Sequence, residues 1–442
     1  MKALILSCGG SPEPLKFCIA DFEPDFTYFL CSSDSVDIAV NISKECNIDD
    51  NQFAVKVVSN HESLEDSFAK SREIIKELQK QYDNIHVDFT GGTKPMVSGL
   101  VLAAIGEECT YSYVGSKDFQ GRDKEGLGVV QNGFESIKDQ RDPYDVFAVM
   151  EFNRGMDFFN RYQFEAARVN FKEASEKLES ENLKELSLLY IDLVDVYDRW
   201  DKFKNVKGKK LTLNRYLTKI LEKISSSQNL KNHIEETYPE FIPQIKENIK
   251  FLDLKLSRNG RIKPQNVEYY LPDLLNNAYR RIEEGKYDDA VARLYRAIEL
   301  IAQMCLTKHN VINEKNLWGN AEFSINISDI ESKNKIEVDE VLATFSDYNK
   351  SKNFGKNTFK LASKNSYELL ESLGSQFATD YLNDEQLNIN IGSRNRSILA
   401  HGLQPIDKDK AVELYSQVLK YAKRALPDLV EYMDMADFPK FE

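Results

Sequence analysis

The first 115 residues alternate short apolar runs with amphipathic stretches. Apolar runs bounded by small or polar residues predict strands at 3–7, 26–31, 53–58, 85–89 and 110–114. Apolar positions every three or four residues predict a helix over 63–81, and 95–106 is apolar on nearly all sides, as in a helix packed on a sheet. Because strands alternating with helices form right-handed βαβ units, we predict an α/β Rossmann-like N-terminal domain with a parallel sheet.

From residue 144 onward the pattern is almost wholly helical. Two segments share one apolar stripe with spacings of four, three and four residues, the face of a single helix. The aligned pairs are Ala167 with Ala290, Phe171 with Leu294, Ala174 with Ala297, and Leu178 with Ile301. The stripe indicates either a helical platform for dimerisation or two independent amphipathic helices.

Turn-forming and charged segments divide the chain. The glycine- and charge-rich stretch 116–132 predicts a hairpin or flap, and Asp142-Pro143 then marks a boundary. Residues 257–263 are typical of a linker, and 202–210 of a short basic, solvated turn. We therefore predict an α/β domain over 1–140, a helical connecting region over 141–260 and an all-α domain over 261–442.

Composition excludes several classes of function. With 42% hydrophobic and 29% charged residues and a net charge of −13, the chain lacks a broad basic face for non-specific nucleic-acid binding. The six cysteines form no CxxC motif, so we expect reduced thiols and no metal site. No apolar run reaches 18 residues and no cleavable leader is recognisable, which predicts a cytoplasmic protein without a membrane partner.

Two loops of small hydrogen-bond donors follow predicted strands. They are Ser7-Cys8-Gly9-Gly10-Ser11 and Thr90-Gly91-Gly92-Thr93-Lys94. In a parallel sheet such loops open at the carboxyl ends of the strands, where ligands bind. Glycines allow close backbone approach, the following helix favours an anion, Thr93 can cap that helix and Lys94 adds a charge. The Walker and GxGxxG patterns are absent, so neither ATP hydrolysis nor dinucleotide redox chemistry is favoured.

The string DFTGGTKPM at 88–96 resembles the signature of CARF domains, the CRISPR-associated Rossmann-like sensors. The resemblance implies that a cyclic oligoadenylate, cA4 or cA6, binds across a dimer. The residues implied to face the ring are Gly9, Gly10, Ser11, Thr90, Gly91, Gly92, Thr93 and Lys94. Weaker candidates after the second and third strands are Ser32, Ser33, Ser59 and Asn60.

A second motif, GSRNRSILAHG at 392–402, lies near the C-terminus. Helix stop signals, Gly402 and a nearby proline, predict that His401 ends a helix, where the dipole favours imidazolium. Arg394 lies seven residues earlier, about two turns, on nearly the same face, whereas Arg396 points off it. Arg and His without carboxylates suit RNA transesterification, with His as general acid or base and Arg stabilising the phosphate. Asn395 can orient the imidazole or bind a phosphate.

RNRSILAHG resembles the R-x(4–6)-H motif of HEPN ribonucleases, and the helical stretches 272–304 and 409–421 resemble the helical bundle of that family. Either Arg394 or Arg396 with His401 satisfies the pattern, and the Arg–Asn order favours Arg394. Together the two motifs resemble the CARF–HEPN ribonucleases of type III CRISPR systems. This implies a metal-independent, homodimeric endoribonuclease that cuts single-stranded RNA in antiviral defence, without a cofactor, and is activated allosterically by its cyclic ligand.

Two alternatives remain at this point. The chain could be a non-catalytic, ligand-responsive regulator, which would need a basic DNA-reading helix that is not apparent in the C-terminal half. The HEPN region could also serve only as a dimerisation or nucleotide-binding module.

Overall fold

The computed structural model describes residues 1–117, 121, 130–207, 211–256, 264–309, 311, 324–326, 358–360, 362–395 and 402–442. The chain divides into two compact units. The N-terminal unit comprises Met1–Glu151 with Glu176–Leu183, and the helical unit comprises Phe152–Ser175 with Lys184–Glu442. The predicted domain boundaries near residues 140 and 260 stay predictions, and the proposed linker at 257–263 lies outside the described residues.

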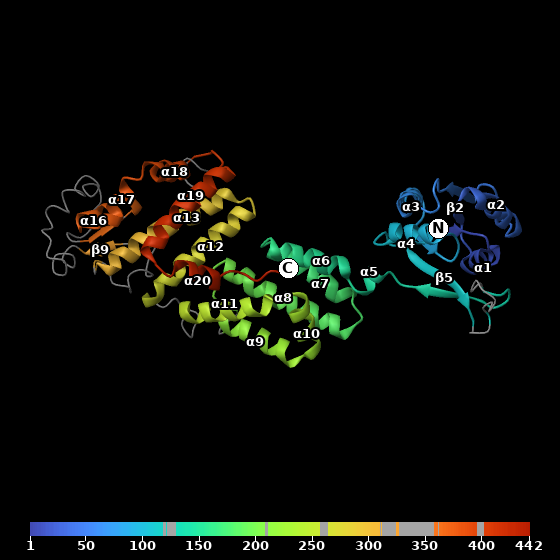
Figure 1. Cartoon of the computed structure of the whole chain (residues 1–442), viewed down its shortest axis with the longest axis horizontal. Coiled ribbons are helices and arrows are strands. Elements are labelled where there is room, and N and C mark those ends of the chain that lie inside the picture. Colours follow the sequence, from blue (N-terminus) through green and yellow to red (C-terminus); the bar gives the residue numbers. More distant parts are fainter. Residues whose placement is uncertain are drawn as a thin grey trace. The chain divides into compact units, whose positions relative to one another are not determined.

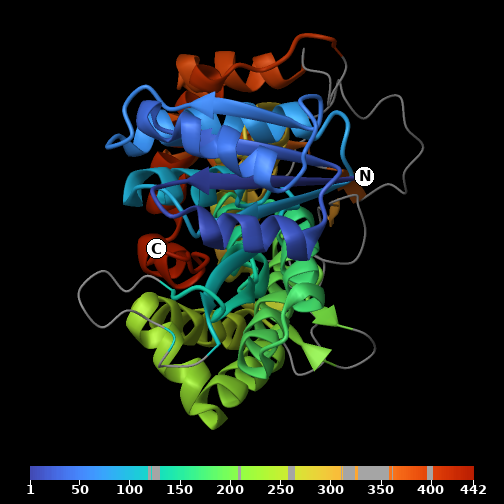
Figure 2. The same ribbon diagram turned by 90° about the vertical axis from the view of Figure 1, so that its right-hand side faces the viewer.

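The N-terminal unit is built on a six-stranded sheet of order β3-β2-β1-β4-β5-β6 (Figures 1 and 2). Its strands are β1 (Lys2–Cys8), β2 (Phe26–Cys31), β3 (Phe53–Val57), β4 (Asn84–Asp88), β5 (Thr110–Ser116) and β6 (Glu135–Gln140). The first five strands are parallel, which confirms the predicted α/β Rossmann-like fold. The antiparallel edge strand β6 was not predicted. The strand order reverses between β1 and β4, and this is the switch point of the sheet.

Both faces of this sheet are covered by helices, because successive strand residues point to opposite sides. Ala3 and Ile5 share one core with α3 (Leu64–Leu78) and α4 (Lys94–Ala104). Leu4 and Leu6 share the other with α1 (Pro12–Phe22) and α2 (Val36–Glu45). The prediction that the apolar stretch 95–106 packs on the sheet is confirmed. A short helix α5 (Pro143–Val146) follows β6 and is capped by Asp142.

The rest of the described chain is almost wholly helical, as predicted. Its helices are α6 (Val149–Asn160), α7 (Phe164–Lys177), α8 (Glu181–Asp201), α9 (Leu213–Ser226), α10 (Gln228–Thr237), α11 (Phe241–Lys255), α12 (Tyr270–Glu283), α13 (Tyr287–Lys308), α16 (Ser363–Ser372), α17 (Gln376–Leu382), α18 (Glu385–Asn395), α19 (Lys408–Ala425) and α20 (Leu429–Met435). Two short antiparallel pairs interrupt them, β7 (Val206–Lys207) with β8 (Leu211–Thr212) and β9 (Ser324–Asn326) with β10 (Thr358–Lys360). Within the described ranges, no helix is long and apolar enough to cross a membrane.

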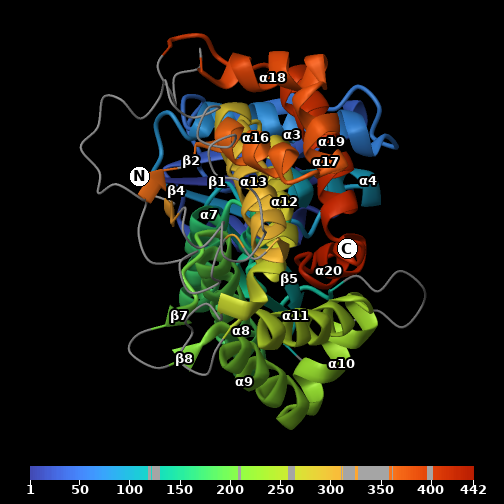
Figure 3. The same cartoon turned by 90° about the vertical axis from the view of Figure 1, so that its left-hand side faces the viewer.

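Two apolar cores organise the helical unit. One is formed by α6 to α11, and the other by α12, α13 and α16 to α19, of which α12, α13 and α19 lie side by side (Figures 1 and 3). All eight aligned residues of the two apolar stripes are buried. Ala167 and Phe171 lie in the first core, and the four residues of the second stripe lie in the second core. Phe441, near the C-terminus, enters the first core and packs on Phe241, with ring centroids 4.7 Å apart.

Charged side chains are buried where the two cores adjoin. Lys255 of α11 pairs with Asp273 of α12, both fully buried, and the Trp200 indole donates to the same carboxylate at 3.0 Å. Asp201 of α8 accepts from Arg280 of α12 at 2.8 Å. These pairs tie the connecting helices to the C-terminal bundle.

Candidate functional site

The two predicted glycine loops meet at the switch point of the sheet. The Ser7 hydroxyl, at the end of β1, donates to the Gly91 carbonyl at 2.5 Å. A Cβ on Gly9 would lie 2.5 Å from the Gly92 nitrogen, and one on Gly91 would overlap the Ser7 carbonyl oxygen. Gly92 has φ = +90°, a conformation that favours glycine. The loops therefore interlock, and only glycine fits between them.

Thr93 caps α4, as predicted, and joins a third loop to this edge. Its hydroxyl accepts from the Met96 N–H at 3.4 Å and donates to the His61 carbonyl at 2.5 Å. Lys94, the first residue of α4, is exposed. The carboxyl edge of the sheet therefore presents backbone donors, a helix N-terminus and a cation together, which suits an anionic ligand.

The weaker candidates lie at the same edge, after β2 and β3, but several take part in local turns. The Ser32 hydroxyl lies 3.1 Å from that of Ser35, in a capping box, and the Ser33 hydroxyl donates to Asp34. The Asn60 carboxamide oxygen accepts from the Glu62 N–H at 3.1 Å. Gly10, Ser11 and Ser59 are exposed.

A buried polar chain beneath the second loop was not predicted. Asp88, fully buried, accepts from the Thr90 N–H at 3.0 Å and from the Ser112 hydroxyl at 2.8 Å. The His86 ring contacts the Ser112 and Thr110 hydroxyls at 2.8 and 2.7 Å. Burial raises the pKa of the Asp88 carboxyl and lowers the pKa of His86 to about 4. The sequence signal for this buried polar chain is that residues 86 and 88, and 110 and 112, are polar residues at alternate positions of otherwise apolar strands.

The second motif is only partly placed. Arg394 and Asn395 form the last two residues of α18, while Arg396 and His401 lie outside the described residues. α18 is fixed to α19 by the Asn390 carboxamide, which donates to Gln417 at 3.0 Å, and by Gln386, which donates to Glu413 at 3.0 Å. Among the residues that the structure describes, no group of three His, Cys, Asp or Glu could hold a metal ion.

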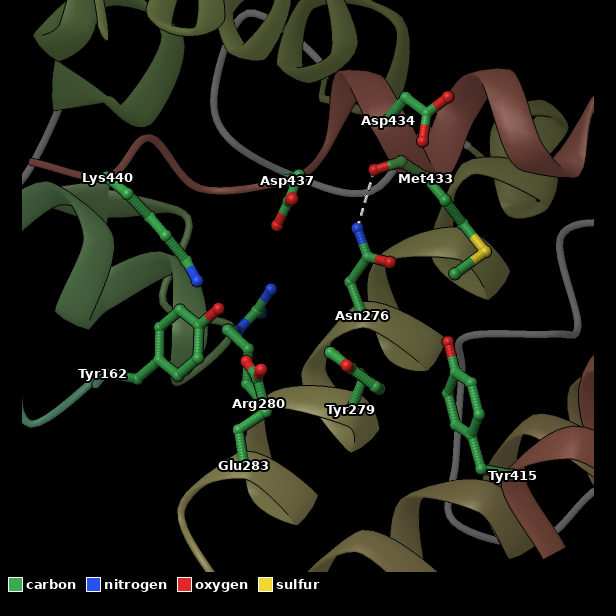
Figure 4. Close-up of a pocket in the computed structure, with 10 residues that line it drawn as sticks. All are labelled: Tyr162, Asn276, Tyr279, Arg280, Glu283, Tyr415, Met433, Asp434, Asp437 and Lys440. Atoms are coloured by element: carbon green, nitrogen blue, oxygen red, sulfur yellow. Dashed lines mark hydrogen bonds between the residues drawn. The ribbon is translucent and has the colours of Figure 1, made fainter. Parts of the chain in front are cut away.

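The helical unit also contains a cavity of about 350 Å³ (Figure 4). Its lining comprises Tyr162, Asn276, Tyr279, Arg280, Glu283, Tyr415, Met433, Asp434, Asp437 and Lys440. Arg280 is almost fully buried over the Phe438 ring at 3.9 Å, and its Nη1 and Nη2 have no hydrogen-bond partner among the described residues. The lining carries two cationic and three acidic side chains, so its charge selects no single class of ligand.

The fold and the first site define a Rossmann-like domain joined to a helical unit. Residues 259–425 match the family model described as the Csm6 HEPN domain. The predicted HEPN domain is thereby confirmed, and the match includes the whole Arg–Asn–His motif. Together with the Rossmann-like sheet and its glycine loops, it supports the CARF–HEPN class drawn from the sequence. The search of curated proteins gave no significant match.

Solved structures similar to the chain include the following three. "Enterococcus italicus Csm6 bound to cyclic hexa-2′-fluoro-hexa-dAMP" is similar over 98% of this chain and 97% of its own, at 13% identity and a TM-score of 0.49. A type III CRISPR defence DNA nuclease activated by cyclic oligoadenylate is similar over 45% of this chain and 34% of its own, at 13% identity and a TM-score of 0.24. Can2 from Sulfobacillus thermosulfidooxidans, in complex with cyclic tetra-adenylate, is similar over 51% of this chain and 68% of its own, at 14% identity and a TM-score of 0.22.

Proposed function

We propose that the chain is a CRISPR endoribonuclease that cuts single-stranded RNA when a cyclic oligoadenylate binds to its N-terminal unit. The observation that carries the nuclease assignment is the Csm6 HEPN match over 259–425, which contains Arg394, Asn395, Arg396 and His401. In this proposal His401 transfers the proton, Arg394 stabilises the phosphate and Asn395 orients the imidazole.

The activator site is proposed at the carboxyl edge of the sheet. The ring phosphates would lie on the amides of the interlocked loops, beside the start of α4 and the Lys94 ammonium. Backbone amides of glycine are suited to this task because no side chain keeps the phosphate away. A ring of identical units also suits a two-fold axis, where each protomer of a homodimer offers the same loops.

Cleavage of a fluorescent single-stranded RNA, with cyclic tri-, tetra- or hexa-adenylate and excess EDTA, tests the proposal. One ring size should activate cleavage, and the products should carry 2′,3′-cyclic phosphate or 3′-phosphate ends. A strict magnesium requirement or 5′-phosphate products would contradict the HEPN mechanism. Absence of cleavage despite tight activator binding would favour the non-catalytic regulator instead.

Two substitutions separate sensing from cutting. His401→Ala should abolish cleavage and leave activator binding unchanged. Lys94→Ala should weaken activator binding by about 1.5–3 kcal/mol, the contribution of a charge-assisted hydrogen bond. Lys44→Ala, at an exposed lysine in the last turn of α2, is the matched control and should bind as the unmodified chain does. Weak activator binding by His401→Ala together with normal cleavage by Lys94→Ala would reverse the two assignments.

The catalytic site is proposed to be shared between two protomers. The motif supplies one His per chain, while acid–base transesterification is best served by two catalytic groups. In mixtures with an excess of His401→Ala chains, activity should therefore fall faster than the unmodified fraction. Activity proportional to that fraction, or a monomer in light scattering with activator bound, would show that each chain acts alone.

A further inference from the structure

The second glycine loop rests on a buried carboxylate. Asp88 Oδ1 accepts the Thr90 N–H at 3.0 Å, and the Thr90 hydroxyl accepts the Val114 N–H of β5 at 2.7 Å. The start of the loop is thus held from both strands that flank it. Asp88 and Ser112 are fully buried, so water does not replace these contacts.

When Asp88 is ionised, the hydrogen bonds beneath the loop have one consistent direction. An ionised Asp88 can only accept, so the single Ser112 hydroxyl proton points to Asp88 Oδ2. Ser112 Oγ must then accept from His86 Nε2–H, at 2.8 Å. Neutral His86 accepts at Nδ1, which lies 2.7 Å from the Thr110 hydroxyl. The chain therefore runs from Thr110 through His86 and Ser112 to Asp88, and every member is satisfied.

Filling a core does not require these residues. His86 and Asp88 lie directly beside Thr110 and Ser112 in the β4–β5 register, among apolar neighbours such as Ile85 and Val87. A buried charge is costly unless it is fully hydrogen-bonded, and apolar side chains would stabilise these strand positions without that cost. The Asp88 carboxylate instead accepts a hydrogen bond from the Thr90 N–H, the first amide of the glycine loop.

We infer that Asp88, Ser112 and His86 are positioning residues, which hold the Thr90–Gly92 loop in the conformation that binds the activator. The inference rests on the proposed function, because it assigns the loop to activator binding. None of the three residues needs to touch the ligand. Their effect reaches it through the Thr90 amide and the interlocked glycines.

Activator titration with the full-length chain, using the ring size that binds most tightly, tests this role. Ser112→Ala removes the donor to Asp88 and the acceptor of His86, so affinity should fall about ten- to a hundredfold. Asp88→Ala should weaken binding at least as much. Thr27→Val is the matched control, because this hydroxyl is equally buried in β2 and has no hydrogen-bond partner among the described residues. It should leave affinity unchanged.

Asp88→Asn distinguishes positioning from mere packing. The Asn oxygen can still accept from the Thr90 N–H. Its NH₂ group donates to Ser112, which reverses the direction of the hydrogen bonds from Ser112 through His86 to Thr110. Affinity should therefore stay within about threefold of the unmodified chain, and the His86 proton should move from Nε2 to Nδ1. Nitrogen-15 NMR of histidine-labelled protein reports this tautomer, and His86→Asn assigns its signal among the five histidines.

Each outcome is decisive. Unchanged activator affinity in Ser112→Ala and Asp88→Ala would overturn the inference, as would a loss of affinity well beyond threefold in a folded Asp88→Asn variant. Failure of the unmodified chain to bind any cyclic oligoadenylate, with the Nε2–H tautomer present, would instead refute the proposed function. If the alanine variants unfold, the affinity of Asp88→Asn still decides the question.

Discussion

Replacing Lys255 by methionine should destabilise the helical unit severely. The ammonium of Lys255 pairs with Asp273 where neither side chain is exposed, and it also lies 4.5 Å from the Tyr270 ring centroid. Methionine keeps most of the side-chain volume but leaves the Asp273 carboxylate, among the residues that the structure describes, with only the Trp200 N–H, at 3.0 Å. Breaking a buried ion pair from one side costs about 3–5 kcal/mol.

A double substitution distinguishes the cost of the unpaired Asp273 carboxylate from the cost of lost packing. In Lys255→Met/Asp273→Asn no charge remains, and the Asn oxygen still accepts from Trp200. The new NH₂ group takes the place of the Asp273 oxygen that Lys255 contacted and has no acceptor in methionine, so the expected loss is about 1–2 kcal/mol. The double variant should therefore be more stable than the single one. The exposed pair of Lys250 with Glu247 on the same helix is the control, and Lys250→Met should cost less than about 0.5 kcal/mol.

The assay is equilibrium urea unfolding at pH 7, followed by the fluorescence of Trp200 in a Trp318→Phe background. The chain has two tryptophans, so this background leaves one reporter beside the ion pair. A loss below about 1 kcal/mol in Lys255→Met, or a double variant no more stable than the single one, would refute the assignment of an uncompensated charge.

Three further predictions concern the two units. Gly91→Ala should cost about 1–3 kcal/mol in thermal unfolding and weaken activator binding, because its Cβ overlaps a β1 carbonyl, whereas Gly10→Ala, with open space around it, should leave the unfolding temperature unchanged. His86 has a pKa of about 4 when folded and near 6.5 when unfolded, so the unfolded chain takes up a proton first. Stability should fall by about 2–3 kcal/mol as the pH falls from 6.5 to 4.5, and urea unfolding of His86→Asn should lack this contribution. Phe441→Ala should lower the free energy of unfolding of the helical unit by about 3–5 kcal/mol, because it removes a buried ring. Urea unfolding followed by circular dichroism measures this loss, and Leu188→Ala, at an exposed residue, should cause little change.

Much of the N-terminal unit could be predicted because its signals are local. The parallel strands are buried or partly buried on both faces and therefore appear as short apolar runs, and each loop that needs close backbone approach contains glycine. The cap at Thr93 was likewise visible as a Thr before a Pro-containing first turn. Strand β6 was not predicted because it is a polar edge strand, in which the partly buried Ile137 is the single apolar residue.

The sequence by itself determined the elements, the two glycine loops and the HEPN motif, since residues close along the chain carry each of these signals. Only the tertiary structure decided which distant residues meet. Asp201 pairs with Arg280 across 79 positions, and Ser112 reaches Asp88 across 24. In the sequence these are polar residues on amphipathic helices or near strand ends, where solvent exposure is the ordinary expectation. Their burial follows from helix packing and strand register, which depend on the whole fold.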